Sequence, residues 1–270
     1  MSKSGRGARK PAELAGQPAR PASQLPDLTD QALPGEVAEL VGELTEEPGR
    51  ARRLRAGAFR LARRGGRTGR AGWHGVRSGG RWLTSEALAM APRLPVRDQQ
   101  TLRAQFPGLD PEELAEALIR GSSRVAASVG AAVGGAMFLP LPAAPVEIAV
   151  ETLALVGIEV KLVAELHEVY GMRAPGPAPE RALAYLSAWA HRRGVSVVPG
   201  GLVLAVGSPL RRRLERRLLV RAGRSAASLG PLLTGAAAGA LLNRQETRRL
   251  GSDVRDDLRR RSAPGNRWAD

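Results

Sequence analysis

The feature that most constrains this chain is a run of 22 uncharged residues, 125–146, followed directly by a long helical pattern. The run is rich in Gly and Ala and ends in the proline cluster Pro140, Pro142 and Pro145. Proline suits the first turn of a helix, and glycine suits the left-handed position just beyond a helix end. The sequence therefore predicts two helices joined by a proline-containing turn, with the second helix beginning at Pro145 and ending before Gly171.

The predicted second helix carries a wide apolar face that a single carboxylate, Glu159, interrupts. The opposite side carries Glu147, Glu151, Lys161, Glu165 and Glu168, which we expect to face solvent, with Lys161 and Glu165 as an i,i+4 ion pair. A carboxylate within an apolar stripe needs a partner or a wet cavity. Glu159 is therefore expected at an edge, in a structural ion pair, or in a candidate polar site together with Glu147 and Glu151.

The composition excludes several kinds of chemical site. The chain has no Cys and only three His, His74, His167 and His191. It therefore has no disulfide framework, no thiol nucleophile and no Cys-based zinc site, and a centre built from several His is nearly excluded. Glu165, His167 and Glu168 do not reproduce the Glu-x-x-His spacing of di-iron helices. We predict no metal and no cofactor.

The rest of the chain reads as helices of different lengths, because its apolar residues are mainly Ala, Leu and Val. We predict an all-α helical bundle with two Gly/Ala-rich helical hairpins and disordered termini. Asp110-Pro111 is a strong helix start, with Asp as the N-cap and Pro at the first helical position. The expected units are a disordered tail over 1–34, short helices with an Arg-rich segment over 35–108, a helical domain over 109–262 and a disordered tail over 263–270. Further helices are expected at 35–47, 82–92, 97–106, 178–193 and 243–261, and a short apolar run at 195–206.

Two Gly/Ala-rich segments, 125–139 and 225–243, share small residues at helical spacing. Faces of this kind let two helices approach closely, so we expect the segments to pack against each other. The expected helix-packing residues are Gly130, Gly134, Gly235 and Gly239. Two readings of 125–139 are open, a buried core helix or a membrane-inserted hairpin, since the run is long enough to span a membrane but poor in Leu, Ile and Phe.

The net charge of +15 is concentrated in two arginine-rich blocks. Residues 49–85 hold eleven Arg and no acid, and residues 208–224 hold seven Arg and one acid. The candidate anionic-surface residues are Arg50, Arg52, Arg53, Arg55, Arg60, Arg63 and Arg64 in the first block and Arg211, Arg212, Arg213, Arg216 and Arg217 in the second. A solvated segment, an anionic lipid surface, an acidic protein partner and nucleic acid are the alternatives that this charge leaves open.

The order of the pieces over residues 110–262 resembles the bacterial EcsC-like family. The resemblance rests on a Gly/Ala-rich helix, a proline turn, a long helix ending in Val169-Tyr170-Gly171, and a late Gly-rich stretch, 234–243, that ends in Asn243 and is followed by Thr247-Arg248-Arg249-Leu250-Gly251. It implies an all-helical fold and a link to the membrane or a transport system. It transfers no catalytic residues, because the molecular activity of that family is not established.

These observations together predict a non-enzymatic, helical protein that acts at the cytoplasmic membrane face and meets an anionic membrane surface or an acidic protein partner. Because the first residues carry charges and lack an apolar segment, we expect no secretory signal and a cytoplasmic, membrane-peripheral location. The alternative is a cytoplasmic, nucleic-acid-associated basic protein. An enzyme would need a cavity around Glu147, Glu151, Glu159 and His167, and no nucleophile or metal motif supports one.

Overall fold

The computed structural model describes residues 32–46, 76–136, 144–198, 201–204 and 232–262. These ranges contain seven α-helices, one short 3-10 helix and two short strands, so the predicted all-helical fold is confirmed. Most of both expected tails lies outside the described residues. The predicted anionic-surface arginines, Arg50–Arg64 and Arg211–Arg217, also lie outside the described residues.

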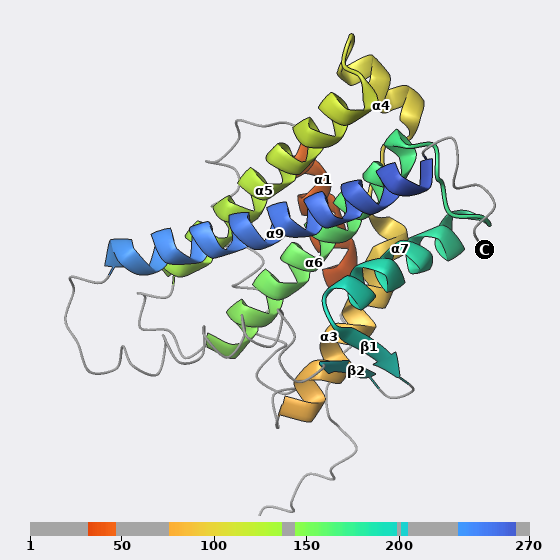
Figure 1. Cartoon of the computed structure of the whole chain (residues 1–270). Coiled ribbons are helices and arrows are strands. Elements are labelled where there is room, and N and C mark those ends of the chain that lie inside the picture. Colours follow the sequence, from red (N-terminus) through yellow and green to blue (C-terminus); the bar gives the residue numbers. More distant parts are fainter. Residues whose placement is uncertain (1–31, 47–75, 137–143, 199–200, 205–231, 263–270) are drawn as a thin grey trace, which may run out of the picture.

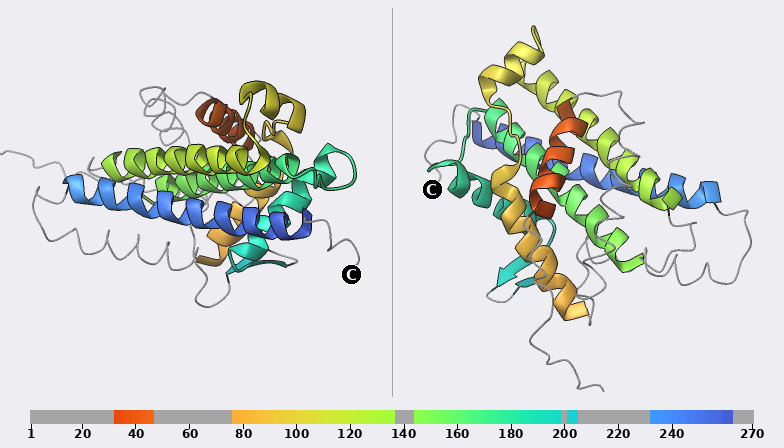
Figure 2. Two further views of the ribbon diagram at one scale, coloured as in Figure 1. Left: turned by 45° about the horizontal axis from the view of Figure 1, so that its top comes forward. Right: turned by 180° about the vertical axis from the view of Figure 1, so that it is seen from behind.

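Helix α6 (Ala144–Val169) forms the centre of the structure, and every residue from 151 to 166 is buried. Helices α5 and α9 pack on one side of it and α1 and α3 on the other (Figures 1 and 2). The helix ends as predicted at Gly171, whose φ of 66° is in the left-handed region. The amide of Gly171 donates to Glu168 O and that of Met172 to His167 O, a pattern that satisfies two free carbonyls of the last turn.

Helices α5 (Pro111–Ala136) and α9 (Leu232–Ser262) run antiparallel along one face of α6. Asp110 caps α5 as predicted, because its carboxylate accepts from the Glu113 amide while Glu113 accepts from the Asp110 amide. Helix α9 differs from the expectation of a hairpin arm followed by a separate helix from Asn243. It is continuous because Asn243, Leu250 and Leu258, spread over both halves, lie on one buried side.

Helices α1 (Ala32–Glu46) and α3 (Val76–Met90) cover the opposite side of α6, and the 3-10 helix η1 (Ala91–Arg93) leads from α3 toward α4 (Gln99–Gln105). Helix α1 starts three residues before the predicted position. At Gly157 of α6 a Cβ would lie 2.9 Å from a Val41 methyl, so α1 rests directly on the central helix. Leu33 and Val41 share one hydrophobic cluster with α5, α6 and α9, and the core therefore continues across the expected boundary at residues 108 and 109.

Helix α7 (Ala178–Arg192) is followed by the strands β1 (Val195–Val198) and β2 (Gly201–Leu204). The strands pair antiparallel, with Val195 opposite Leu204 and Val198 opposite Gly201. The sequence indicated only an apolar run here. Three of the four β1 residues are valines, whose branched side chains suit strands better than helices, which explains this small addition to a helical protein.

Candidate functional site

The burial of the polar residues of α6 is the main difference between the structure and the sequence-based predictions. Glu151, Lys161, Glu165 and Glu168 were expected to face solvent, but each retains only 1–6% of its exposed area. The prediction was wrong because α6 has neighbouring helices on every side, so its polar stripe has no access to water. For Glu147 the structure gives the position in α6 but not its surroundings. Buried charges need partners, and these partners define a polar network around α6.

Glu159 lies at the best-connected point of this network. Its Oε1 accepts from Arg193 Nη2 at 2.5 Å and from Thr247 Oγ1 at 2.9 Å. Its Oε2 accepts from Arg193 Nε at 3.0 Å and from Trp189 Nε1 at 2.9 Å. Glu159 is thus held by a two-pronged guanidinium contact and two neutral donors. The structure places it in an ion pair, one of the expectations that the sequence left open.

Helix α7 delivers two of these partners because Trp189 and Arg193 are four residues apart and lie on one side of the helix. Arg193 follows the last residue of α7, and its amide donates back to Trp189 O. A cation at that point also interacts favourably with the negative end of the helix dipole. Arg193 Nη1 contacts Glu246 Oε2 at 3.1 Å, so one buried guanidinium joins α6, α7 and α9.

A second buried contact joins α5, α6 and α9. Asn243 Nδ2 donates to Ala126 O at 3.2 Å and lies 3.4 Å from Glu151 Oε1. Asn243 and Thr247 are four residues apart on α9, and both are fully buried. They therefore align α9 with α6 at two successive turns, one at Glu151 and one at Glu159.

A third cluster attaches the segment before α4 to α6. Lys161 Nζ lies 3.0 Å from Glu165 Oε1, which is the predicted i,i+4 pair in a buried setting, and Lys161 also donates to Pro95 O. Arg97 contacts both oxygens of Glu165, with Nε at 2.8 Å and Nη2 at 2.7 Å. Two cations thus contact one buried carboxylate and join the segment before α4 to α6.

His167 is a titratable group whose surroundings change its pKa. Its Nδ1 lies 2.7 Å from Val163 O, and its ring lies 5.2 Å from that of Tyr185. Burial lowers the pKa of His167 below the ordinary value of 6.5, although the hydrogen bond to Val163 opposes this effect. His167 is therefore neutral in the folded protein at pH 7.

A pH-dependent stability follows from this burial. Between the lowered pKa of folded His167 and the ordinary value of 6.5, the unfolded chain binds more protons at this residue than the folded chain does. The contribution of neutral His167 to the free energy of unfolding is therefore fully present above pH 6.5 and is lost as the pH falls through the folded pKa. We expect urea unfolding between pH 7.5 and pH 5 to show a smaller loss of stability for His167→Gln than for the unchanged protein. His191 is exposed, so His191→Gln serves as the control and should keep the original slope. An unchanged slope in His167→Gln would contradict this assignment.

The residues that an enzyme would need do not converge. Along α6, Glu159 follows Glu151 by eight residues and His167 follows Glu159 by eight residues. Each interval corresponds to about 12 Å along the helix axis. Each has its own hydrogen-bond partner: Asn243 for Glu151, Arg193 for Glu159 and Val163 O for His167. The carboxylates thus act as connections between helices, which is a structural role.

Two of the four predicted packing glycines are brought face to face. A Cβ at Gly130 would lie 2.8 Å from the carbonyl oxygen of Gly239 and 2.5 Å from Asn243 Nδ2. A Cβ at Gly239 would lie 3.3 Å from the carbonyl oxygen of Gly130. Gly134 and Gly235 belong to the same two helices, at positions whose surroundings lie outside the description. The pattern did not single out Gly251, where a Cβ would lie 2.8 Å from the side chain of Ile119.

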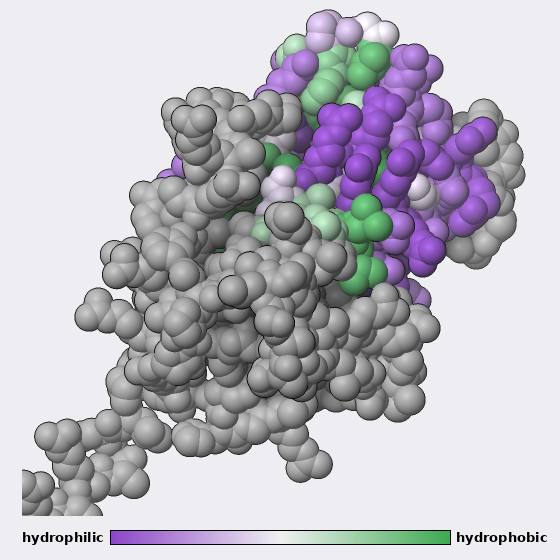
Figure 3. Space-filling model, turned by 90° about the vertical axis from the view of Figure 1, so that its left-hand side faces the viewer, coloured by the Kyte–Doolittle hydropathy of each residue, from purple (hydrophilic) through white to green (hydrophobic). Residues whose placement is uncertain are grey.

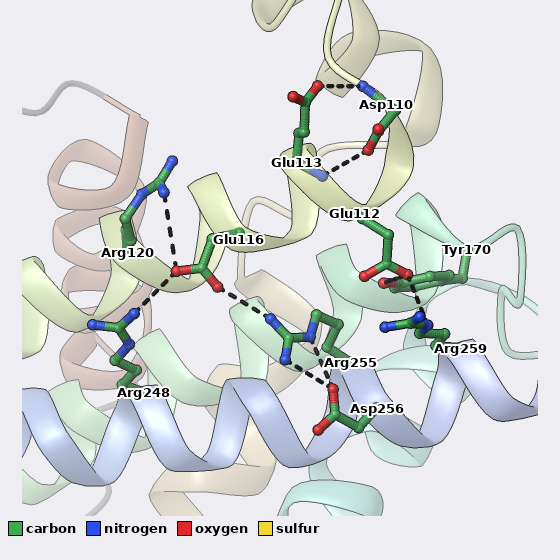
Figure 4. Close-up of polar contacts among 10 residues, drawn as sticks. All are labelled: Asp110, Glu112, Glu113, Glu116, Arg120, Tyr170, Arg248, Arg255, Asp256 and Arg259. Carbon is green, nitrogen blue, oxygen red and sulfur yellow. Dashed lines mark hydrogen bonds and ion pairs between the residues drawn. The ribbon is translucent and has the colours of Figure 1, made fainter.

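The outer seam between α5 and α9 holds a row of ion pairs (Figure 4). Glu116 of α5 contacts Arg248 and Arg255 of α9 at 3.2 Å each and Arg120 of its own helix at 4.0 Å. Glu112 accepts from the hydroxyl of Tyr170 at 2.9 Å, and burial together with this bond raises the pKa of that hydroxyl. Arg255 also contacts Asp256 Oδ1 at 2.9 Å, so guanidinium groups and carboxylates contact one another along the whole seam.

Most arginines of α5 and α9 lie outside their acidic partners, with Arg255 as the exception, because it is 24% exposed and its partner Asp256 is 48% exposed. Six side chains are 51–77% exposed, namely Arg120, Arg248, Arg249, Arg259, Arg260 and Arg261. Their partners Glu112, Glu116, Glu246 and Asp257 are only 22–43% exposed. Figure 3 shows one side of the molecule, where hydrophilic side chains cover much of the described surface and a hydrophobic patch lies among them. At these six arginines the outermost charge is therefore positive.

Comparison with protein-family models, with curated protein sequences and with solved structures finds no match. Within the described ranges, no group of three or more metal-ligating side chains is placed to hold an ion. Over the same ranges, no helix combines the length and the hydropathy needed to cross a bilayer.

The residues that matter most in this network were only partly visible in the sequence. Glu159 was singled out because it interrupts an apolar stripe, and that interruption calls for a cation. Arg193 and Thr247 were not predicted as partners of Glu159, because they lie 34 and 88 residues from it in the chain. Arg97 was not predicted as a partner of Glu165, which is 68 residues away. The sequence indicated that Glu159 needs a cationic partner, but the sequence pattern does not show which of the many arginines pairs with it.

Proposed function

We propose that this protein is a non-enzymatic helical protein that binds anionic lipid headgroups at the cytoplasmic membrane face. The observation that carries the proposal is the layering of charge along α5 and α9. The six exposed arginines extend into solvent while their carboxylate partners lie beneath them. A phosphate headgroup that approaches this surface meets guanidinium groups first, and guanidinium binds phosphate in a two-pronged geometry.

Two further observations support a binding role. Glu159 and Glu165 of α6 are engaged in contacts that join this helix to other parts of the fold. The arginine blocks 49–85 and 208–224 add positive charge to the same chain, and the resemblance to the EcsC-like family agrees with a membrane link. An arginine near an anionic bilayer contributes roughly 1 kcal/mol, so several together give a useful affinity.

The test is flotation of the full chain with vesicles of phosphatidylcholine alone or with phosphatidylserine added. We expect flotation only with the anionic vesicles, and we expect the triple variant Arg249→Gln, Arg260→Gln, Arg261→Gln to reduce the vesicle partition coefficient on the order of 100-fold. The matched control carries the same change at Arg93, Arg103 and Arg181 on η1, α4 and α7. Equal losses in both triple variants would contradict the assignment to α9, since net charge alone would then explain binding.

A duplex DNA competitor separates the membrane proposal from the nucleic-acid alternative. If flotation with anionic vesicles persists in the presence of an equal mass of DNA, headgroup binding is supported. If DNA abolishes flotation and the DNA complex weakens steeply with salt, the protein is a nucleic-acid binder and the proposal fails. The absence of flotation with anionic vesicles at low salt would also overturn it.

A further inference from the structure

We infer that α9 lies in the plane of the membrane interface, with its outward stripe against an anionic bilayer and Leu241 inserted at the boundary between headgroups and acyl chains. This inference rests on the proposed function and specifies how the surface meets lipid. It starts from the exposed side chains of α9. Leu241 is 58% exposed, more than any other large hydrophobic residue that the structure describes, the next being Leu183 at 41%.

The position of Leu241 on the helix places it beside the arginines. Ala237, Leu241, Arg248 and Arg259 are separated by four, seven and eleven residues, which are nearly whole numbers of helical turns. All four are exposed, while Asn243, Thr247, Leu250, Val254 and Leu258 on the other side of α9 are buried against the core. One outward stripe therefore contains both apolar and cationic side chains.

The charge along this stripe changes at one point. Residues 225–243 contain no charged side chain, whereas α9 carries seven Arg and four acids from Arg244 onward. Helices that lie on membranes combine apolar side chains, which enter the acyl boundary by about 5–10 Å, with cations at headgroup level. Nucleic acid would offer phosphates to the arginines but no apolar layer to Leu241. The composition of the stripe therefore fits an anionic bilayer better than a polyphosphate.

The architecture leaves this stripe accessible from one side only. Helix α9 covers one side of α5 and α6, and α3 lies on the opposite side of the bundle (Figures 1 and 2). When α9 faces a membrane, an exposed residue on α3 stays in water. Leu88 is such a residue, 38% exposed on α3, and provides a matched reference for Leu241.

The absence of Cys from the chain allows a direct test. Leu241→Cys and Leu88→Cys are each labelled with a polarity-sensitive fluorophore and mixed with phosphatidylcholine–phosphatidylserine vesicles, with and without nitroxide-labelled lipids. We expect the label at position 241 to shift its emission to the blue and to be quenched by the nitroxide, and the label at position 88 to do neither. Circular dichroism of both labelled proteins confirms that the helices are intact.

The outcomes separate this inference from the proposed function. If the vesicles float the protein while the label at 241 stays in water, headgroup binding stands and the insertion of Leu241 is wrong. If the label at 88 responds instead, the opposite face meets the membrane and the orientation is wrong. If the protein does not float at all, the proposed function itself fails.

As a second measurement, Leu241→Ser should weaken flotation at high salt on the order of tenfold, because apolar burial is not screened by ions.

Discussion

Replacing Arg193 with Met should lower the free energy of unfolding by about 3–5 kcal/mol, which is the cost of leaving a buried charge without its partner. Arg193 and Glu159 are 5% and 1% exposed, so water cannot replace the lost guanidinium. Glu159 would keep the hydrogen bonds from Trp189 and Thr247, but neither donor carries charge. The loss should appear in urea unfolding followed by circular dichroism.

The adjacent residue supplies a matched control. Arg192 forms an ion pair with Asp257 at 2.7 Å, but the two side chains are 27% and 22% exposed. Arg192→Met therefore removes the same charge from the same helix end where water compensates, and we expect a loss of about 1 kcal/mol or less. If Arg193→Met and Arg192→Met lowered the free energy of unfolding by similar amounts, burial would not be the main source of the stability that the Arg193–Glu159 pair provides. A loss below 1 kcal/mol for Arg193→Met would contradict the network as a source of stability.

Gly130→Ala should destabilise the protein by about 1–3 kcal/mol, although alanine favours helices over glycine. The added methyl would lie 2.8 Å from the carbonyl oxygen of Gly239, which belongs to the backbone and cannot turn away. It would also lie 2.5 Å from Asn243 Nδ2, which donates to Ala126 O. Helices α5 and α9 must therefore separate locally, and the contact between Asn243 and Glu151 weakens with them.

Gly121→Ala is the control for this prediction because it lies in the same helix. A Cβ at Gly121 meets no atom within 4 Å, so the alanine adds helix propensity without a clash. We expect Gly121→Ala to raise the free energy of unfolding by up to about 1 kcal/mol. The two variants should thus change stability in opposite directions in the same denaturant experiment. An increase for Gly130→Ala would show that the close approach of α5 and α9 is not a tight contact.

Local chemistry in the sequence predicted much of the helical framework. Asp110-Pro111 and Gly171 mark helix ends through capping interactions that involve residues close in the chain. For the same reason α7 was predicted to within one residue of its end at Arg192. The strands after Gly194 were not predicted, because a short apolar run fits a strand or a buried helix equally well.

The surface character of polar residues was predicted poorly at the centre of the fold. A helix with an apolar stripe and a charged stripe is typical of a helix at the protein surface, which is why Glu151, Lys161 and Glu165 were assigned to solvent. Their burial depends on a third layer of helices, since α1 and the segment around Arg97 cover the side that α5 and α9 leave open. The number of neighbours that a helix acquires is not encoded in its own periodicity.

The amino-acid sequence alone was sufficient to establish the helical class, the Gly/Ala contact between two distant segments and the need of Glu159 for a partner. These follow from interactions within a few turns of one helix or from the size of side chains. Only the folded chain established that Arg193 is that partner and that the six exposed arginines of α5 and α9 lie outside their carboxylates. It also established that Leu241 shares one exposed stripe of α9 with Arg248 and Arg259. The physical reason is that burial and charge layering depend on which elements pack together, and that packing joins residues 30 to 139 positions apart in the chain.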